Sequence, residues 1–166
     1  MSPQTKTEKD TFLENFEREY QTTLKVLKGY PANQAELKPA EKLKPARELA
    51  WMLVLNQLVL VPTLDGELSP GRFPPAPATL GEVIAGFEKA HRDTTARIVA
   101  STEAEWNATV KVPVGPQQIA DVRRGDALWM FHHDTIHHRG QFTVYVRLAG
   151  GKLASVYGPT ADEPWW

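Results

Sequence analysis

The chain contains no cysteine among its 166 residues. This absence excludes disulfide bonds, thiolate nucleophiles and cysteine-ligated metal sites, so any metal must be held by His, Asp or Glu. An excess of positive charge is lacking as well, because 19 Lys and Arg residues stand against 20 Asp and Glu residues, giving a net charge of -1. Without a basic surface to attract a phosphate backbone, we expect no nucleic-acid partner.

A hydrophobic run long enough to cross a membrane is also missing. The longest run, Leu49 to Val61, is interrupted by Asn56 and Gln57, and its roughly 13 residues fall short of the 20 or so that a span needs. The amino-terminal segment MSPQTKTEKD is polar and lacks the apolar stretch of a signal peptide. We therefore expect a soluble, cytoplasmic protein with no membrane partner.

The composition is that of a folded globular protein. Hydrophobic residues make up 42% and charged residues 23% of the chain, close to the values of ordinary soluble domains. A length of this order is typical of one domain. We expect a single domain over residues 1–166.

Four segments have the apolar periodicity of amphipathic helices. In the first, Phe12, Phe16 and Tyr20 follow one another at intervals of four, which places them on one helical face. The third opens with Thr79 followed three residues later by Glu82, the pattern of a capping box. The expected helices cover about 7–28, 45–61, 79–101 and 126–148. The sequence thus predicts an all-α protein, a four-helix bundle with long connecting loops.

The segments between these helices are rich in residues that break regular structure. Pro62 is expected to end the second helix, and the stretch 65–77, with two glycines and four prolines, predicts a long loop. The segment 102–124 predicts at most a short ribbon or an extended crossing. The tail after Lys152 ends in ADEPWW, and its tryptophans are expected to cap the bundle or to contact a second chain.

The densest cluster of reactive side chains lies on the fourth helix, where four histidines occur within residues 132–138. Residues four apart share a helical face, so Asp134 and His138 form one pair of metal-ligand type. His133 and His137 form a second pair, turned from the first by about 100°. The alternative is a polar helix edge without a metal, because one helix alone does not complete a ligand set. Spacing leaves both readings open.

Other residues have simpler interpretations. His91, in the charged segment EKAHRD, is expected on the surface. Gly140 lies inside a helix, where glycine costs about 1 kcal/mol relative to alanine, so we expect close helix packing there. Arg139 and Gln141 are expected to hydrogen-bond neighbouring loops or a partner chain. Trp51 and Trp129 are expected to be packing anchors.

The segment IHHRGQFTVYVRLAGGKLASVYGPTADEP, together with RELAW earlier in the chain, resembles the DinB-like family of bacterial stress-associated proteins. The order of helices fits this family over nearly the whole chain. The resemblance implies a compact four-helix bundle, often a homodimer, from a group of metal-dependent enzymes that includes thiol-dependent transferases and isomerases. For most members the reaction is unknown.

The resemblance also implies a metal site of three histidines, one on the second helix and two on the fourth. Carried over by position, these become Met52, Asp134 and His138. Only His138 matches, although a carboxylate such as Asp134 also ligates zinc, nickel or manganese. Met52 is the main departure, because a thioether is a weak ligand for these ions and a common core residue. Glu48, Asn56, His133 and His137 are alternative sources of a third ligand.

Two hypotheses follow. In the first, the protein is a divalent-metal-dependent enzyme, of thiol transferase or hydrolase type, whose metal is held by Asp134, His138 and one further group. In the second, it is a non-catalytic dimeric bundle that has lost its metal and binds a small molecule or has a structural role. Asp134 and His138 are candidate metal ligands, and no catalytic residue is assigned.

Overall fold

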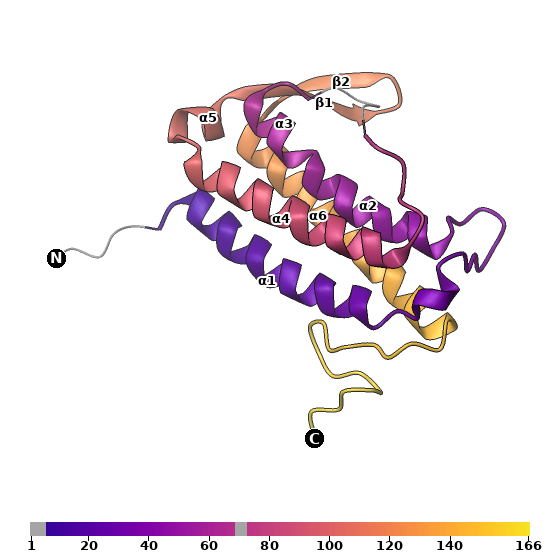
Figure 1. Ribbon diagram of the computed structural model, residues 1–166. Helices are drawn as coiled ribbons and strands as arrows, with labels where there is room; N and C mark the ends of the chain where they lie inside the picture. Colours follow the sequence, from indigo (N-terminus) through magenta and orange to yellow (C-terminus); the bar gives the residue numbers. More distant parts are fainter. Residues whose placement is uncertain (1–5, 69–72) are drawn as a thin grey trace.

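The computed structural model describes residues 6–68 and 73–166, and they form a helical bundle with a small β-ribbon at one end (Figure 1). Residues 1–5 and 69–72 lie outside the described residues, and they include part of the expected amino-terminal segment and of the expected long loop. The elements, in chain order, are α1 (Glu8–Lys28), the 3-10 turn η1 (Ala32–Gln34), α2 (Ala46–Leu58), α3 (Leu60–Asp65), α4 (Leu80–Ala100), α5 (Glu103–Asn107), β1 (Thr109–Gly115), β2 (Gln118–Arg123) and α6 (Arg124–Leu148). The all-α prediction is broadly confirmed, with a two-stranded sheet in addition.

Local sequence accounts for where several helices begin. Thr7 accepts a hydrogen bond from the amide of Asp10 at the start of α1, and Asp10 accepts one in return. Thr79 and Glu82 form the same reciprocal pair at the start of α4, as the sequence predicts. Each capping box satisfies two amides that have no partner inside the helix.

Pro62 does not end the second helical segment, so this prediction is wrong. A new helix, α3, begins at Leu60, which places Pro62 in its first turn. Proline is tolerated there because the amides of a first turn have no intrahelical partner. The helix ends instead at Gly66, which has a left-handed φ of 79° and forms the C-terminal turn that glycine favours.

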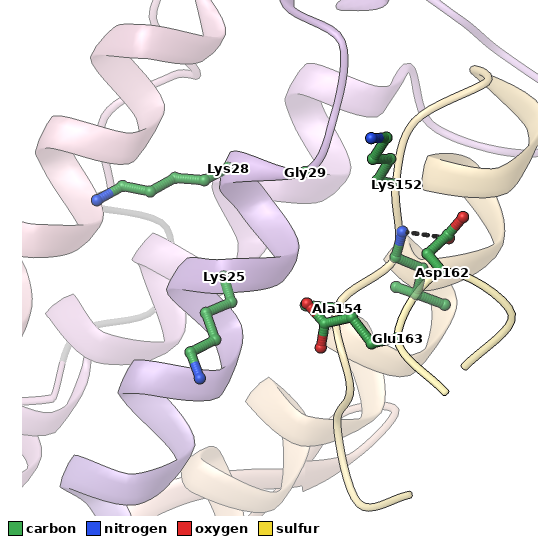
Figure 2. A pocket seen from close by; sticks show the side chains of 8 residues that line it. Lys25, Lys28, Gly29, Lys152, Ala154, Asp162 and Glu163 are labelled. Atoms are coloured by element: carbon green, nitrogen blue, oxygen red, sulfur yellow. Dashed lines mark hydrogen bonds between the residues drawn. The ribbon is translucent and has the colours of Figure 1, made fainter. Parts of the chain in front are cut away.

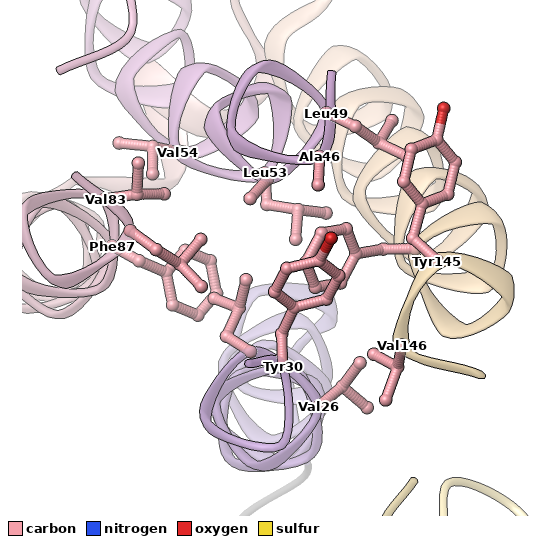
Figure 3. Packing of buried hydrophobic residues seen from close by; sticks show 14 of the residues in the cluster. Val26, Tyr30, Ala46, Leu49, Leu53, Val54, Val83, Phe87, Tyr145 and Val146 are labelled. Atoms are coloured by element: carbon pink, nitrogen blue, oxygen red, sulfur yellow. The ribbon is translucent and has the colours of Figure 1, made fainter. Parts of the chain in front are cut away.

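The four longest helices, α1, α2, α4 and α6, surround a common core, and Figure 3 shows side chains from all four pointing toward one another. Contacts between distant residues give their directions. Glu19 and Asn15 on α1 contact Arg139 and His132 on α6, so these two helices run parallel. Asn56 near the end of α2 contacts α6 well before its end, and Tyr145 Oη donates to the carbonyl of Lys44, just before α2. The helices α2 and α6 are therefore antiparallel.

A buried polar layer crosses the middle of the bundle. It separates an apolar cluster that contains Leu53 and Phe87 from a second cluster that contains Phe12 and Leu128. In α1, α4 and α6, and in the segment formed by α2 and α3, the polar residues of the layer fall in sequence between the members of the two clusters. The layer consists of Glu19, Thr23, Asn56, Gln57, His91, Thr94, His132, Thr135 and Arg139.

His91 belongs to this layer, and the prediction that it lies on the surface is wrong. His91 is only 5% exposed. Its ring stacks on Tyr20 with centroids 3.7 Å apart, and its Nε2 lies 2.8 Å from a carboxylate oxygen of Glu17. Burial lowers the pKa of His91, and its hydrogen bond to the Glu17 carboxylate opposes this effect. The charged neighbours in sequence occupy the outer face of α4, whereas the imidazole faces inward.

His132 is buried still more deeply, and its Nε2 donates to Asn15 Oδ1 over 2.8 Å. Its Nδ1 has no hydrogen-bond partner among the described residues. Burial lowers the pKa of His132 from 6.5 to about 4; the charge of Glu19 opposes this shift, and Arg139 adds to it. The folded protein therefore holds His132 as a neutral ring at neutral pH.

The depressed pKa of His132 predicts loss of stability in mild acid. The unfolded chain takes up a proton on His132 near pH 6.5, whereas the folded chain does so only near pH 4. Between these values the free energy of unfolding should fall by about 3 kcal/mol from this residue. Urea unfolding of the wild type and a His132→Gln variant, from pH 7 to pH 4, measures the difference. Equal losses in the two proteins would contradict the assignment, because other acid-sensitive groups are common to both.

The ribbon confirms the prediction of a short extended segment between the last two long helices. The strands β1 and β2 are antiparallel, with Val110 opposite Val122 and Val112 opposite Ala120. Val110 and Val112 are buried against Ala127 of α6, because alternate residues of a strand face the same side. The ribbon covers one end of the bundle.

One segment among the described residues, Ala46–Asp65, is long and apolar enough to cross a membrane by composition alone. In its apolar window 56% of the residues are buried inside the bundle. The segment is longer than the apolar run expected from sequence because α3 extends it. Its burial is that of a core helix.

The carboxyl-terminal tail packs against the bundle through its middle rather than its end. Gly29 and Gly151 let the backbones at the ends of α1 and α6 approach closely, since a Cβ on Gly29 would collide with the carbonyl of Lys152. Trp166 is 93% exposed, so the final tryptophan does not cap the bundle.

Gly140 lies inside α6, where the sequence predicts close helix packing. A Cβ at Gly140 would meet nothing within 4 Å among the described residues. The prediction of close packing at this glycine is therefore wrong within one copy of the chain.

Candidate functional site

The two predicted ligand candidates on α6 lie together and contact each other. Asp134 Oδ2 is 3.2 Å from His138 Nε2, as expected for side chains one helical turn apart. The same carboxylate oxygen accepts a hydrogen bond of 2.8 Å from Asn56 Nδ2 on α2. The structure therefore places an Asp–His pair at the contact between α2 and α6, partly open to solvent.

The hydrogen bonds continue along α6 through Gln141. Its Oε1 lies 3.0 Å from His138 Nδ1, and its Nε2 lies 3.0 Å from His137 Nε2. We call these five residues, Asn56, Asp134, His138, Gln141 and His137, the polar network. It connects the α2–α6 contact to an exposed imidazole.

Met52 lies on α2 at the same level of the bundle as the Asp134–His138 pair. The contacts Asn56–Asp134 and Lys44–Tyr145 align α2 with α6 in opposite directions. Met52 lies one turn before Asn56, and therefore at the level of His138, one turn after Asp134. The position at which the family resemblance implies a third metal ligand therefore carries a thioether, which is a weak ligand for zinc, nickel and manganese.

A proline-rich strap, residues 73–77, covers α2 next to Met52. Trp51 Nε1 donates to the carbonyl of Pro74 over 2.8 Å, and Arg47 donates to the carbonyl of Pro77 over 2.9 Å. Met52 and Glu48 line a hollow of about 470 Å³ beneath this strap. Glu48 is therefore directed to a different hollow from Asp134.

A second hollow, of about 460 Å³, opens beside Asp134. We call it the α6 hollow. It combines apolar side chains with imidazole, amide and carboxylate groups, and its lining residues are Asn56, Met130, Phe131, His133, Asp134 and His137. This mixture of an apolar surface and a few polar groups is typical of small-molecule sites.

The side chains present do not fit a tightly held divalent metal at the predicted position. Among residues 6–68 and 73–166, no three His, Asp or Glu side chains are grouped so as to hold a metal ion. Asp134 and His138 bind each other, and both ring nitrogens of His138 already have partners. Since metal sites of this kind use three protein ligands, two engaged ligands opposite a methionine make a poor donor set.

Comparison with known proteins agrees with this architecture. Residues 15–142 match the family model described as the DinB superfamily, and this range covers most of the chain, including Met52, Asp134 and His138. The chain belongs to the DinB superfamily.

Two solved structures of DinB-like proteins share the fold. One, from Bacillus subtilis, is 21% identical, covers 88% of this chain and 97% of its own, and has a TM-score of 0.70. The other, from Bacillus cereus, is also 21% identical, covers 88% of this chain and 95% of its own, and has a TM-score of 0.73. No curated protein matches this DinB chain.

A third hollow, of about 480 Å³, lies between the end of α1 and the tail (Figure 2). It shares no lining residue with the polar network. Lys25 and Lys28 of α1 lie on one side of it, and Lys152, Asp162 and Glu163 of the tail lie on the other. The two carboxylates bind the tail's own backbone, at the amides of Leu153 and Ser155. They hold the tail in place, so we assign this hollow a structural role.

Sequence reasoning missed a buried ion pair beside the histidine segment of this DinB chain. Arg139, 1% exposed, donates to Glu19 Oε2 on α1 over 2.6 Å and to Tyr157 Oη in the tail over 2.6 Å. Tyr157 Oη in turn donates to Glu19 over 2.8 Å. The contact with the tail confirms the expectation for Arg139, but the partner on α1 is not foreseeable from the pattern around it. The one signal in the sequence is Glu19 itself, which lies three residues after Phe16 on the apolar side of the first helix.

Proposed function

We propose that this DinB-superfamily protein binds a small organic molecule in the α6 hollow, without a tightly held divalent metal. The observation that carries the proposal is the polar network. It joins Asp134 to His138 and Asn56, and the position at which the family resemblance implies a third ligand carries Met52. Those side chains are satisfied by one another, so they gain little from a metal.

The lining of the α6 hollow indicates the chemistry of its ligand. Met130 and Phe131 provide apolar contact, and Met130 is 38% exposed. Asp134 supplies a carboxylate at the same surface, and its contacts with His138 and Asn56 both involve Oδ2, which leaves Oδ1 for a ligand. A molecule with an apolar body and one hydrogen-bond donor or cationic group, such as an amine, matches this combination.

The rival function is a thiol transferase or hydrolase with a divalent metal held by Asp134, His138 and one further group. The two functions differ in metal content. Wild-type protein loaded with zinc, nickel or manganese and then passed through gel filtration should hold no ion that depends on His138. Elemental analysis of the wild type and a His138→Ala variant measures this. About one ion per chain in the wild type, lost in the variant, would overturn the proposal.

The cytoplasmic location and the homodimer are further proposals that follow from the resemblance to DinB-like proteins. Exposed apolar residues on α6 support an association of two copies. Val144 is 57% and Leu148 is 58% exposed on the same helical face as Gly140. A second copy covering this face would remove apolar surface from water.

A further inference from the structure

A second pair of histidines on α6 stands apart from the Asp134–His138 pair. His133 and His137 are four residues apart, both are exposed, and both line the α6 hollow. Residues at this spacing share a helical face, so one helix can present two imidazoles to one ion. We propose that His133 and His137 bind a divalent transition-metal ion at the mouth of the α6 hollow.

The nitrogen atoms required are accessible in this structure. His137 Nε2 lies 3.0 Å from the amide nitrogen of Gln141 on the exposed side of α6. A metal would displace only this hydrogen bond, and the Gln141 amide is exposed and can turn to water. His133 rests against Trp129, with ring centroids 5.7 Å apart. Rotation of two exposed imidazoles brings them to a common ion at the modest cost of changing rotamers.

The donor set selects the class of metal. Two neutral imidazoles suit copper, nickel and zinc, and affinity among these ions is highest for copper. Magnesium and calcium prefer a shell of oxygen ligands and are not expected to bind. The carboxylate of Asp134 lines the same hollow, so it adds negative charge near the ion. Water completes the coordination, which makes the site open and exchangeable.

This inference goes beyond the proposed function. His133 and His137 line the same α6 hollow, but they are not the Asp134–His138 pair on which the proposed function rests. The His133–His137 pair is turned by about 100° from the Asp134–His138 pair around the helix. It requires neither Met52 nor a change in the α2–α6 contact. Binding of a small molecule in the α6 hollow and binding of a metal at its mouth are therefore separable by variants of different histidines.

The test is a copper(II) titration of the untagged full-length protein. Trp129 is the reporter, because copper held by His133 lies close to its indole and should quench its fluorescence. Electron paramagnetic resonance should show two nitrogen ligands. We expect about one copper per chain at this site, and at least roughly tenfold weaker binding in His133→Ala and in His137→Ala. Magnesium should produce no change.

Two matched variants serve as controls. His138→Ala should bind copper within about twofold of the wild type, because its imidazole belongs to the other pair. Trp129→Phe should keep the copper but lose most of the quenching. Unchanged affinity in the His133→Ala/His137→Ala double variant would overturn the inference. Equal weakening by His138→Ala and His137→Ala would overturn it as well, whereas nickel or zinc retained through His138 would count against the proposed function alone.

Discussion

A Met52→His variant is expected to retain about one zinc or nickel ion per chain after gel filtration, where the wild type retains none through His138. The α2–α6 alignment places residue 52 at the level of His138. An imidazole at this position supplies the third ligand that Asp134 and His138 lack. The gain in metal binding should outweigh the hydrogen bonds that Asp134 and His138 lose to each other, because a structural zinc ion contributes about 10–16 kcal/mol in small metal-binding peptides.

Control variants show whether the gained metal binding depends on residue 52 and His138. A Met52→Leu variant matches the change in packing without adding a ligand, and it should retain no metal. Adding His138→Ala to Met52→His should abolish retention. All proteins are best prepared with His133 and His137 replaced by alanine, which removes the surface pair. If Met52→His folds normally and still holds no metal, residue 52 does not face His138 across the α2–α6 contact.

Replacing Glu19 by leucine should lower the free energy of unfolding by about 3–5 kcal/mol. Glu19 and Arg139 are 4% and 1% exposed in their side chains and lie 2.6 Å apart. Without the carboxylate, the guanidinium stays buried beside Thr23 and Tyr157 with no compensating charge. A buried charge without a partner is among the few changes that cost this much. Urea unfolding at neutral pH measures the loss.

A second substitution distinguishes the loss of a charge pair from poor packing. In a Glu19→Leu/Arg139→Met double variant, no charge remains buried, and most of the lost stability should return. Tyr157 Oη is not stranded, because this tail residue is 65% exposed and can bond to water. An Arg18→Ala variant is the matched control, since Arg18 contacts Glu19 from a side chain that is 65% exposed and should change stability by less than about 1 kcal/mol. A double variant no more stable than Glu19→Leu would show that packing causes the loss.

Most of the helices are predictable because their signals are local. The capping boxes at Thr7 and Thr79 and the apolar spacing of the long helices depend on residues within a few positions of one another. The short helix α5 escapes prediction because the five residues Glu103–Asn107 are too few to show a period. Pro62 misleads because its effect depends on where a helix starts, and the start of α3 at Leu60 is not visible in the pattern.

The candidate site is predictable only as far as one helix reaches. The spacing of Asp134 and His138 on one helix accounts for their mutual contact. Asn56 approaches Asp134 from 78 positions away in the sequence, and Arg139 meets Glu19 across 120 positions. Such pairs result from the packing of whole helices, which periodicity does not report. His91 shows the same limit, because charged neighbours describe one face of α4 and the imidazole occupies the other.

The buried polar layer also affects how the fold holds together. Hydrogen bonds across the layer are directional, whereas the apolar clusters on either side, around Leu53 and around Phe12, are each held by close packing. Each cluster includes residues of α1, of α4, of α6 and of the segment formed by α2 and α3, so we expect the cooperative units of this bundle to run across the helices rather than along them. Partial opening at the ribbon end can then leave the opposite end folded. The histidine segment of α6 lies at the boundary between these two units, where a bound ligand would join them.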